Sequence, residues 1–214
     1  MRAGCAGAAI VIGIMSGSGA FAYVPEPDSA QIADAVDQGV RLAAAHDGYP
    51  SKDYLVHRAK DTLALDPDDG DVDAVLLATP LERTRHAAFM GAYTGHPITA
   101  AEARSGAELP DKWLEVIVFA HGNNDRDRKF GEQFGTATLD FPGRSVASVS
   151  IEHSKPDRSQ YPHTPRDSER FVGTVTYKFD LTWITITQDK PVTLAFDDPS
   201  GKHFEILIDL TRFP

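Results

Sequence analysis

Cysteine is almost absent from this 214-residue sequence, which contains only Cys5. A single cysteine cannot form an internal disulfide, so the fold must depend on buried apolar surface and on hydrogen bonds. Redox-active cysteine pairs and zinc sites built from several thiolates are excluded for the same reason.

Basic residues are also scarce, because 21 Lys and Arg stand against 31 Asp and Glu, giving a formal net charge of −10. No cluster of Lys or Arg stands out in the sequence. A field of this sign repels nucleic acid and anionic bilayers. We therefore expect no nucleic-acid partner, and a neutral, cationic or protein partner is favoured.

The common catalytic motifs are missing as well. The sequence has no G-x-S-x-G elbow, S-x-x-K motif, Walker A sequence or G-x-G-x-x-G turn, and its eight histidines show no H-E-x-x-H or H-x-H spacing. These absences favour a protein that is not an enzyme. Catalytic triads are set by geometry rather than by order along the chain, so a hydrolase stays open as an alternative.

Residues 1–22 have the features of a secretory signal peptide. Arg2 precedes an apolar stretch, and small residues follow that end in the A-x-A sequence closing at Ala22. The glycines and serines of this segment fit a cleavage region better than a membrane-spanning helix. We expect an exported protein, periplasmic or extracellular, with no stable membrane anchor after cleavage and with a single domain at 23–214.

A helix is expected near the start of that domain. Asp28 and Gln31 have the spacing of a capping box, and the apolar pattern that follows predicts a helix at about 29–46. One face of this helix carries the apolar residues Ile32, Val36, Val40 and Ala43.

A helical insertion is expected at about 80–105. Thr79 is placed to cap a helix with Pro80 at its first position and Glu82 at its third. Thr99 begins a second, shorter helix by the same capping logic.

Strands are expected on both sides of this insertion. The nearly continuous apolar runs 72–78 and 114–120 indicate buried strands. The segment 53–65 has strand character and would form a hairpin with the first of these runs through the acidic turn 66–71.

The C-terminal half has alternating patterns typical of antiparallel strands. Residues 147–151 alternate with serines, and residues 175–183 predict one long strand whose phase breaks at Ile184 and Ile186, which suggests a bulge or a bend. The runs 192–196 and 204–210 predict a hairpin.

Together these elements predict an α+β protein, predominantly β: an antiparallel β-sandwich of about eight strands with an N-terminal helix and a helical insertion. In the alternative, strands 72–78 and 114–120 form a parallel βαβ layer in front of a separate C-terminal antiparallel sheet.

His121 is the first candidate for chemistry, because it follows a buried strand and precedes Asp125 and Asp127. A histidine beside aspartates could act as a base or a metal ligand. A polar surface loop is the simpler interpretation.

The acidic turn suggests a Ca²⁺ site, because this cation takes several carboxylate oxygens from one loop. The spacing does not match an EF-hand, and a solvated turn is the simpler interpretation. The candidate ligands are Asp66, Asp68, Asp69 and Asp71.

Two further segments could bind a partner. Arg83 and Arg85 lie early in the capped helix, where free N–H groups favour an anion, although Glu82 could instead face His86 and leave the arginines as ordinary surface. The long polar segment 152–169 is expected to be an irregular binding loop or a disordered one. Its candidate binding residues are His153, Arg158, Tyr161, His163 and Arg166.

The leading hypothesis is an exported non-catalytic protein that binds a protein or another extracytoplasmic ligand through the loops of a β-sandwich. The alternative is an exported acid–base or metal-assisted hydrolase that uses His121 with Asp125 or Asp127. A third interpretation is Ca²⁺-dependent adhesion or stabilisation.

Overall fold

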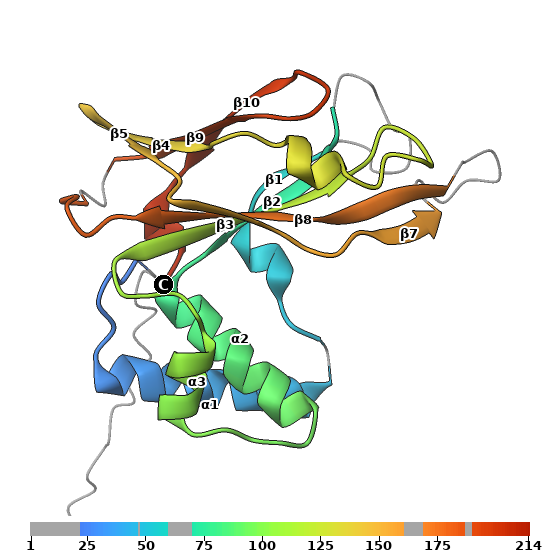
Figure 1. Ribbon diagram of the computed structural model, residues 1–214. Coiled ribbons are helices and arrows are strands. Elements are labelled where there is room, and N and C mark those ends of the chain that lie inside the picture. The colour runs from blue at the N-terminus through green and yellow to red at the C-terminus, as the bar shows by residue number, and fades with distance from the viewer. Residues whose placement is uncertain (1–21, 47, 60–69, 161–168, 187–189) are drawn as a thin grey trace, which may run out of the picture.

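A computed structural model describes residues 22–46, 48–59, 70–160, 169–186 and 190–214. Within these ranges, ten strands form two antiparallel sheets and are accompanied by three α-helices (Figure 1). The expected α+β fold, mostly strand and sandwich-like, is therefore confirmed. The expected signal peptide falls almost entirely on residues 1–21, which lie outside the described ranges.

The large sheet has the order β1-β2-β3-β8-β6, and β7 also pairs with β8. Every strand pair in this sheet is antiparallel. Its strands are β1 (Leu55–Arg58), β2 (Val72–Ala78), β3 (Trp113–His121), β6 (Ser150–His153), β7 (Asp157–Gln160) and β8 (Glu169–Asp180).

The small sheet has the order β10-β9-β4-β5 and is also antiparallel throughout. Its β9–β10 hairpin confirms the one expected from the two alternating runs near the C-terminus. Its strands are β4 (Thr138–Phe141), β5 (Arg144–Ala147), β9 (Val192–Asp197) and β10 (His203–Ile208).

The three helices are α1 (Ser29–Ala45), α2 (Pro80–Tyr93) and α3 (Ala100–Gly106). The expected caps are confirmed, since Asp28 and Thr99 form capping boxes and Thr79 accepts a hydrogen bond from the Glu82 N–H. Short 3₁₀ helices occur at η1 (Ser51–Tyr54), η3 (Phe130–Gln133) and η4 (Leu210–Arg212).

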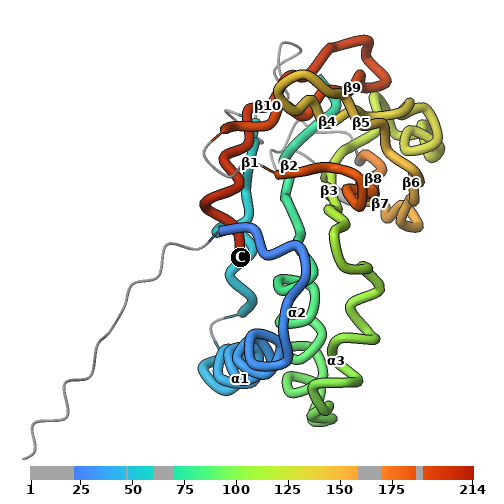
Figure 2. The backbone as a smooth tube through the Cα atoms, turned by 90° about the vertical axis from the view of Figure 1, so that its left-hand side faces the viewer, coloured from blue at the N-terminus to red at the C-terminus, as the bar shows by residue number. Residues whose placement is uncertain are grey.

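The helices pack mainly on one another, at one end of the molecule and away from the small sheet (Figures 1 and 2). Gly39 of α1 lies against the backbone of α2, where an added Cβ would be 2.4 Å from the Arg85 carbonyl oxygen. The absence of a side chain therefore lets the two helices approach closely. Val36, Ala88 and Ala103 form their small shared core.

The main core lies between the two sheets. The face of the large sheet that points toward the small sheet, called the inner face, contributes apolar side chains from alternate positions. Tyr177 of β8 packs against Phe196 of β9 with ring centroids 5.9 Å apart. The fully buried core residues of β3 and β8 are Leu114, Val116, Val118, Val175, Tyr177 and Phe179.

The parallel alternative is wrong, because β2 and β3 are antiparallel neighbours and the two helices simply connect them. A continuous apolar run favours a strand buried on both faces, which is common in parallel sheets. In β2, however, Ala74 and Leu76 are only partly buried, whereas Val75 and Leu77 are fully buried.

Three local expectations need correction. Residues 147–151 are not one strand, since β5 ends at Ala147 in the small sheet and β6 starts at Ser150 in the large one. The expected long strand ends at Asp180, and a turn follows at residues 182–183, so of the two expected irregularities the chain has a bend after the strand and not a bulge within it; Trp183 is 79% exposed. The segment 53–65 begins with η1, and only Leu55–Arg58 is strand within its described part. The run 147–151 alternates by residue type, but its hydrogen-bonding partner changes from β4 to β8 between Ala147 and Ser150.

Among the described residues, no helix has both the length and the apolar character needed to cross a bilayer.

Candidate functional site

His121 is the last residue of β3 and is buried. Its Nδ1 lies 3.1 Å from Oδ1 of Asp73, which belongs to β2. His121 thus pairs with Asp73 of the neighbouring strand, an aspartate that the sequence did not indicate as part of a site. A histidine oriented by a carboxylate is a common part of acid–base sites, but it is also a common structural pair.

Asp125 and Asp127 lie in the loop after β3. Asp127 accepts hydrogen bonds from the Gln133 side chain at 3.1 Å and from the Asn123 backbone N–H at 3.3 Å. Asp125 is exposed. Asp127 therefore fixes the shape of its own loop.

Asp71 is the one candidate Ca²⁺ ligand that lies inside the described ranges, since Asp66, Asp68 and Asp69 fall outside them. Its backbone N–H donates to Oδ2 of Asp198 at 2.7 Å, and its Oδ2 accepts from the Asn123 side chain at 3.2 Å. Burial, and then the nearby Asp198 charge, raise the pKa of Asp71 to about 6, while His121 and Asn123 oppose the rise.

The part of the chain that the structure describes contains no group of three or more His, Cys, Asp or Glu side chains arranged to hold a metal ion. Three of the four expected Ca²⁺ ligands lie outside that part. The Ca²⁺ interpretation therefore stays a prediction.

Arg83 and Arg85 both have partners within the protein. Arg85 Nε donates to the Tyr49 hydroxyl at 3.3 Å, and its guanidinium stacks over the Tyr54 ring at 5.1 Å. Arg83 Nε lies 3.7 Å from Oε2 of Glu115 on β3. The two arginines thus point to different surroundings and do not form a shared anion site.

Glu82 is buried at the start of α2, and it faces Tyr49 rather than His86 as expected. The Tyr49 hydroxyl donates to Oε1 of Glu82 at 2.9 Å, whereas Oε2 has no hydrogen-bond partner. Burial is the main cause that raises the pKa of Glu82 to about 7. His86 packs edge-on against the Tyr49 ring at 4.8 Å.

The expected binding loop at 152–169 is partly strand, because its first residues belong to β6 and β7 at the edge of the large sheet. Tyr161, His163 and Arg166 lie outside the described ranges. Arg158 is exposed on β7, and His153 ends β6. β6 and β7 form in this polar segment because both pair with β8, which supplies backbone hydrogen bonds. A polar sequence gives no sign of such a partner strand.

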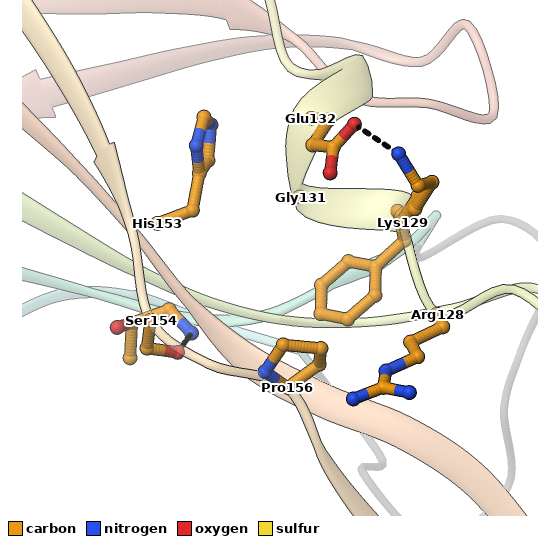
Figure 3. A pocket seen from close by; sticks show the side chains of 9 residues that line it. Arg128, Lys129, Gly131, Glu132, His153, Ser154 and Pro156 are labelled. Atoms are coloured by element: carbon orange, nitrogen blue, oxygen red, sulfur yellow. Dashed lines mark hydrogen bonds and ion pairs between the residues drawn. The ribbon is translucent and has the colours of Figure 1, made fainter.

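Figure 3 shows the small pocket beside His153, with the Lys129–Glu132 ion pair on η3 at its upper side. Its volume is about 60 Å³. Pockets for small molecules usually measure about 300 Å³ or more. This pocket therefore does not support the expected binding role of His153 by itself.

A larger hollow lies on the opposite, outer face of the large sheet, and we call it the outer basin. Its volume is about 260 Å³. It collects residues from α2, from the segment just after α3, and from three strands and their ends. Its lining residues are Arg83, Glu108, Glu115, Glu152, His153, Ser154, Thr174, Thr176 and Lys178.

Four charged residues of alternating sign cross the floor of the outer basin. Glu115 of β3 stands opposite Lys178 of β8 in the strand register. Lys178 Nζ contacts Oε1 of Glu152 on β6 at 2.7 Å, and Arg83 closes the other end beside Glu115. Cross-strand neighbours of opposite charge attract one another, so these four side chains hold one another in position.

Glu115 is the most buried member of this row, with 7% of its side chain exposed. Burial raises the pKa of Glu115 above its ordinary value, and the Arg83 and Lys178 charges oppose this rise. Lys178 is itself only 15% exposed. Three of the four charges of the floor stand on strands and Arg83 stands on α2; such elements position a side chain more rigidly than a loop does.

A second hollow of about 320 Å³ adjoins the outer basin, and the two share Ser154 and Thr174. Its most exposed apolar side chain is Phe119 of β3, at 41%. We call it the apolar hollow; its lining residues are Asp73, Phe119, Ala120, Ser154, Lys155, Asp157, Val172, Gly173 and Thr174.

The sequence carried a faint signal of the outer basin. Glu115 interrupts an apolar run, and Lys178 adds a charge at one of the polar positions of the alternating strand β8. A charge inside a strand pattern indicates a polar face. The pairing of these two residues depends on the register between two strands that are far apart in the sequence, and so it appears only in the structure.

In comparisons with known proteins, no family model matches the chain, no curated protein matches it, and no solved structure matches it. Function therefore has to be inferred from the residues of the site.

Proposed function

We propose that this chain is an exported, non-catalytic binding protein that holds an extracytoplasmic ligand in the outer basin. The observation that carries the proposal is the pair of adjoining hollows on one sheet face, one polar and one with an exposed aromatic ring. Binding sites for small molecules combine a concave apolar surface with a few fixed polar groups.

Binding fits this site better than catalysis does, because the charged floor is arranged in pairs. A general base needs a proton acceptor aimed at the reacting group, and a nucleophile needs a base beside it. In the outer basin, Glu115 and Glu152 instead contact the cations Arg83 and Lys178. Paired charges of this kind can orient a polar ligand without taking part in a reaction.

Fragment binding tests this proposal directly. Wild-type protein titrated with a library of small polyols, amides and amino acids should show NMR shift changes that cluster on residues of the outer basin. Thr176→Trp should abolish them by filling the basin, because Thr176 lies on its floor. Thr193→Trp, a matched change on a strand of the small sheet, should leave them unchanged. Shift changes that cluster elsewhere, or that survive Thr176→Trp, would contradict the proposal.

The proposed export has its own test. Mass spectrometry of the native protein should find an exported product that begins at Tyr23. A product that begins at Met1 and is recovered from the soluble interior of the cell would contradict export.

The hydrolase alternative keeps one specific observation in its favour, the His121–Asp73 pair beside the apolar hollow. It predicts turnover of ester, amide or glycoside substrates that falls at least a hundredfold in His121→Ala. If no substrate in such a panel is turned over by wild-type protein, binding is the better account.

A further inference from the structure

We infer that the ligand of the outer basin is an uncharged oligosaccharide, recognised by the alternating charges of the basin floor and by the exposed Phe119 ring beside it. This inference rests on the proposed binding function and adds the chemical class of the ligand.

The charged side chains of the basin floor are arranged in pairs of opposite sign. Each cation in the row faces a carboxylate: Arg83 lies 3.7 Å from Glu115, and Lys178 lies 2.7 Å from Glu152. A ligand of either net charge would be attracted by one member of each pair and repelled by the other. Strong charge selection is therefore not expected from these two pairs, and the carboxylate of Glu108, which also lines the basin, disfavours an anionic ligand.

A hydroxyl group fits such a row much better. It can donate to a carboxylate and accept from an ammonium or guanidinium at the same time. Glu115 and Glu152 accept only, whereas Arg83 and Lys178 donate only. Vicinal hydroxyls of a sugar ring could therefore bridge one pair of the row, and hydrogen bonds to charged groups are stronger than neutral ones.

The rim of the basin adds hydroxyls of its own. Ser154 Oγ accepts the Thr174 backbone N–H at 2.8 Å, an arrangement that fixes this side chain and leaves its hydroxyl proton able to point toward a ligand. Thr174 and Thr176 stand on the same face of β8. These neutral groups suit a ligand that offers many hydroxyls and no charge.

Phe119 presents a partly exposed aromatic ring beside the basin. It faces away from the main core, stands opposite Thr174 in the strand register, and is 41% exposed. Sugar rings present a face of C–H groups, which gains by leaving water and by lying on the negative face of an aromatic ring. A polar row next to an exposed ring therefore matches both kinds of surface that a sugar presents.

The site consists of two adjoining hollows and is therefore elongated. The two hollows measure about 260 and 320 Å³ and share Ser154 and Thr174. Each is close to the lower limit of about 300 Å³ for a small-molecule pocket. A ligand that occupies both must be elongated, so we expect at least two linked rings rather than a single sugar.

Calorimetry with defined sugars tests the inference on the full exported chain. The probes are uncharged hexasaccharides of glucose, xylose and N-acetylglucosamine, with polygalacturonate and heparin as charged comparators. Wild-type protein should bind at least one uncharged probe, and more tightly than either charged one. Phe119→Ala and Glu152→Gln should each weaken that binding at least tenfold.

Matched variants outside the site separate binding from general damage. Trp183→Ala removes an exposed aromatic that lies in neither hollow, and Glu205→Gln removes an exposed carboxylate of the small sheet. Both should bind like wild type, within about twofold. Loss of binding in Trp183→Ala, with Phe119→Ala intact, would overturn the inference by moving the site.

The outcomes also separate this inference from the proposed function. If polar fragments occupy the basin but no uncharged hexasaccharide binds, or heparin binds more tightly, the oligosaccharide inference fails and the binding function stands. If neither fragments nor sugars perturb the basin residues, both fail.

Discussion

The two faces of the large sheet are built from the same strands yet have opposite chemistry. On the inner face, Val116 of β3 and Tyr177 of β8 are completely buried against the small sheet. On the outer face, their immediate chain neighbours Glu115 and Lys178 line an open hollow. One strand thus contributes to the core and to the candidate site at alternate residues.

The difference shows how the fold can support a site at little cost to its stability. The inner face supplies the apolar burial that holds the sandwich together. Within the described part of the chain, the outer face has two open hollows, and polar side chains line both of them. Substitutions on the inner face should therefore affect folding, and substitutions on the outer face should affect binding.

The largest expected effect is a difference in stability between alanine variants of two phenylalanines, one on each face of the large sheet. Phe179 of β8 is completely buried in the main core, so Phe179→Ala should lower the free energy of unfolding by about 3–5 kcal/mol. Phe119→Ala on the outer face should lower it by less than about 1 kcal/mol, since its ring lies outside the main core and is 41% exposed. Urea denaturation of both variants measures the difference. Equal losses would show that the outer face is part of the core.

The second expected effect concerns pH and Glu82, the buried carboxyl at the start of α2. Its pKa is raised from 4.5 to about 7, so the folded state holds a proton that the unfolded state releases. Stability should therefore fall as the pH rises from about 4.5 to about 7. Glu82→Gln should remove this loss, on the order of 3 kcal/mol, because the amide does not ionise. Denaturation midpoints measured from pH 4 to pH 8 check it.

Tyr49→Phe is the informative control for that experiment. The Tyr49 hydroxyl donates to Glu82 and lowers its pKa. Its removal should raise that pKa further, so the fall in stability should extend to higher pH. A Tyr49→Phe profile that shifts to lower pH would contradict the assignment to Glu82.

The smallest expected effect lies at the polar edge where the two sheets meet. Asp198, in the β9–β10 turn, accepts hydrogen bonds from the backbone N–H groups of Asp71 at 2.7 Å and of Lys202 at 2.9 Å. Asp198→Ala leaves these groups without their acceptor and should cost about 1–3 kcal/mol. The pKa of Asp71 should also fall from about 6, since the Asp198 charge helps to raise it.

Asp197→Ala is the matched control. Asp197 is exposed and pairs with His203 at 2.6 Å on the surface. Its removal should change stability by no more than about 0.5 kcal/mol. Thermal denaturation compares the two aspartates, and NMR titration follows Asp71. If Asp197→Ala lowers stability as much as Asp198→Ala, the hydrogen bonds of Asp198 stabilise the protein no more than a surface ion pair does, and the prediction is wrong.

Local signals in the sequence predicted the helices and several strands well. The capping residues Asp28, Thr79 and Thr99 each start a helix in the structure, because a cap depends only on residues within one turn. The β9–β10 hairpin was predictable for a similar reason, since its two strands are joined by a short turn.

The strand pairings were harder to predict. The run at 147–151 alternates smoothly but spans two strands that belong to different sheets. β6 and β7 lie inside a polar segment, where their pairing with β8 outweighs a weak strand propensity. Such outcomes depend on partners that are distant in sequence, which a local pattern cannot contain.

The candidate site was even less visible. The sequence pattern pointed to His121 with Asp125 or Asp127, whereas the structure brings together Glu115, Lys178 and Glu152 from three strands and Arg83 from a helix. Arg83 was selected as an anion ligand, and it lies beside a carboxylate. Motifs detect groups that are close along the chain, and this site is assembled across strands.

The sequence alone determined the absence of disulfides, the acidic balance, the helix starts and the α+β class, because each depends on composition or on neighbouring residues. The tertiary structure alone decided which charges face one another. An antiparallel register places Glu115 beside Lys178, and a shift of one residue would turn either side chain to the opposite face of the sheet.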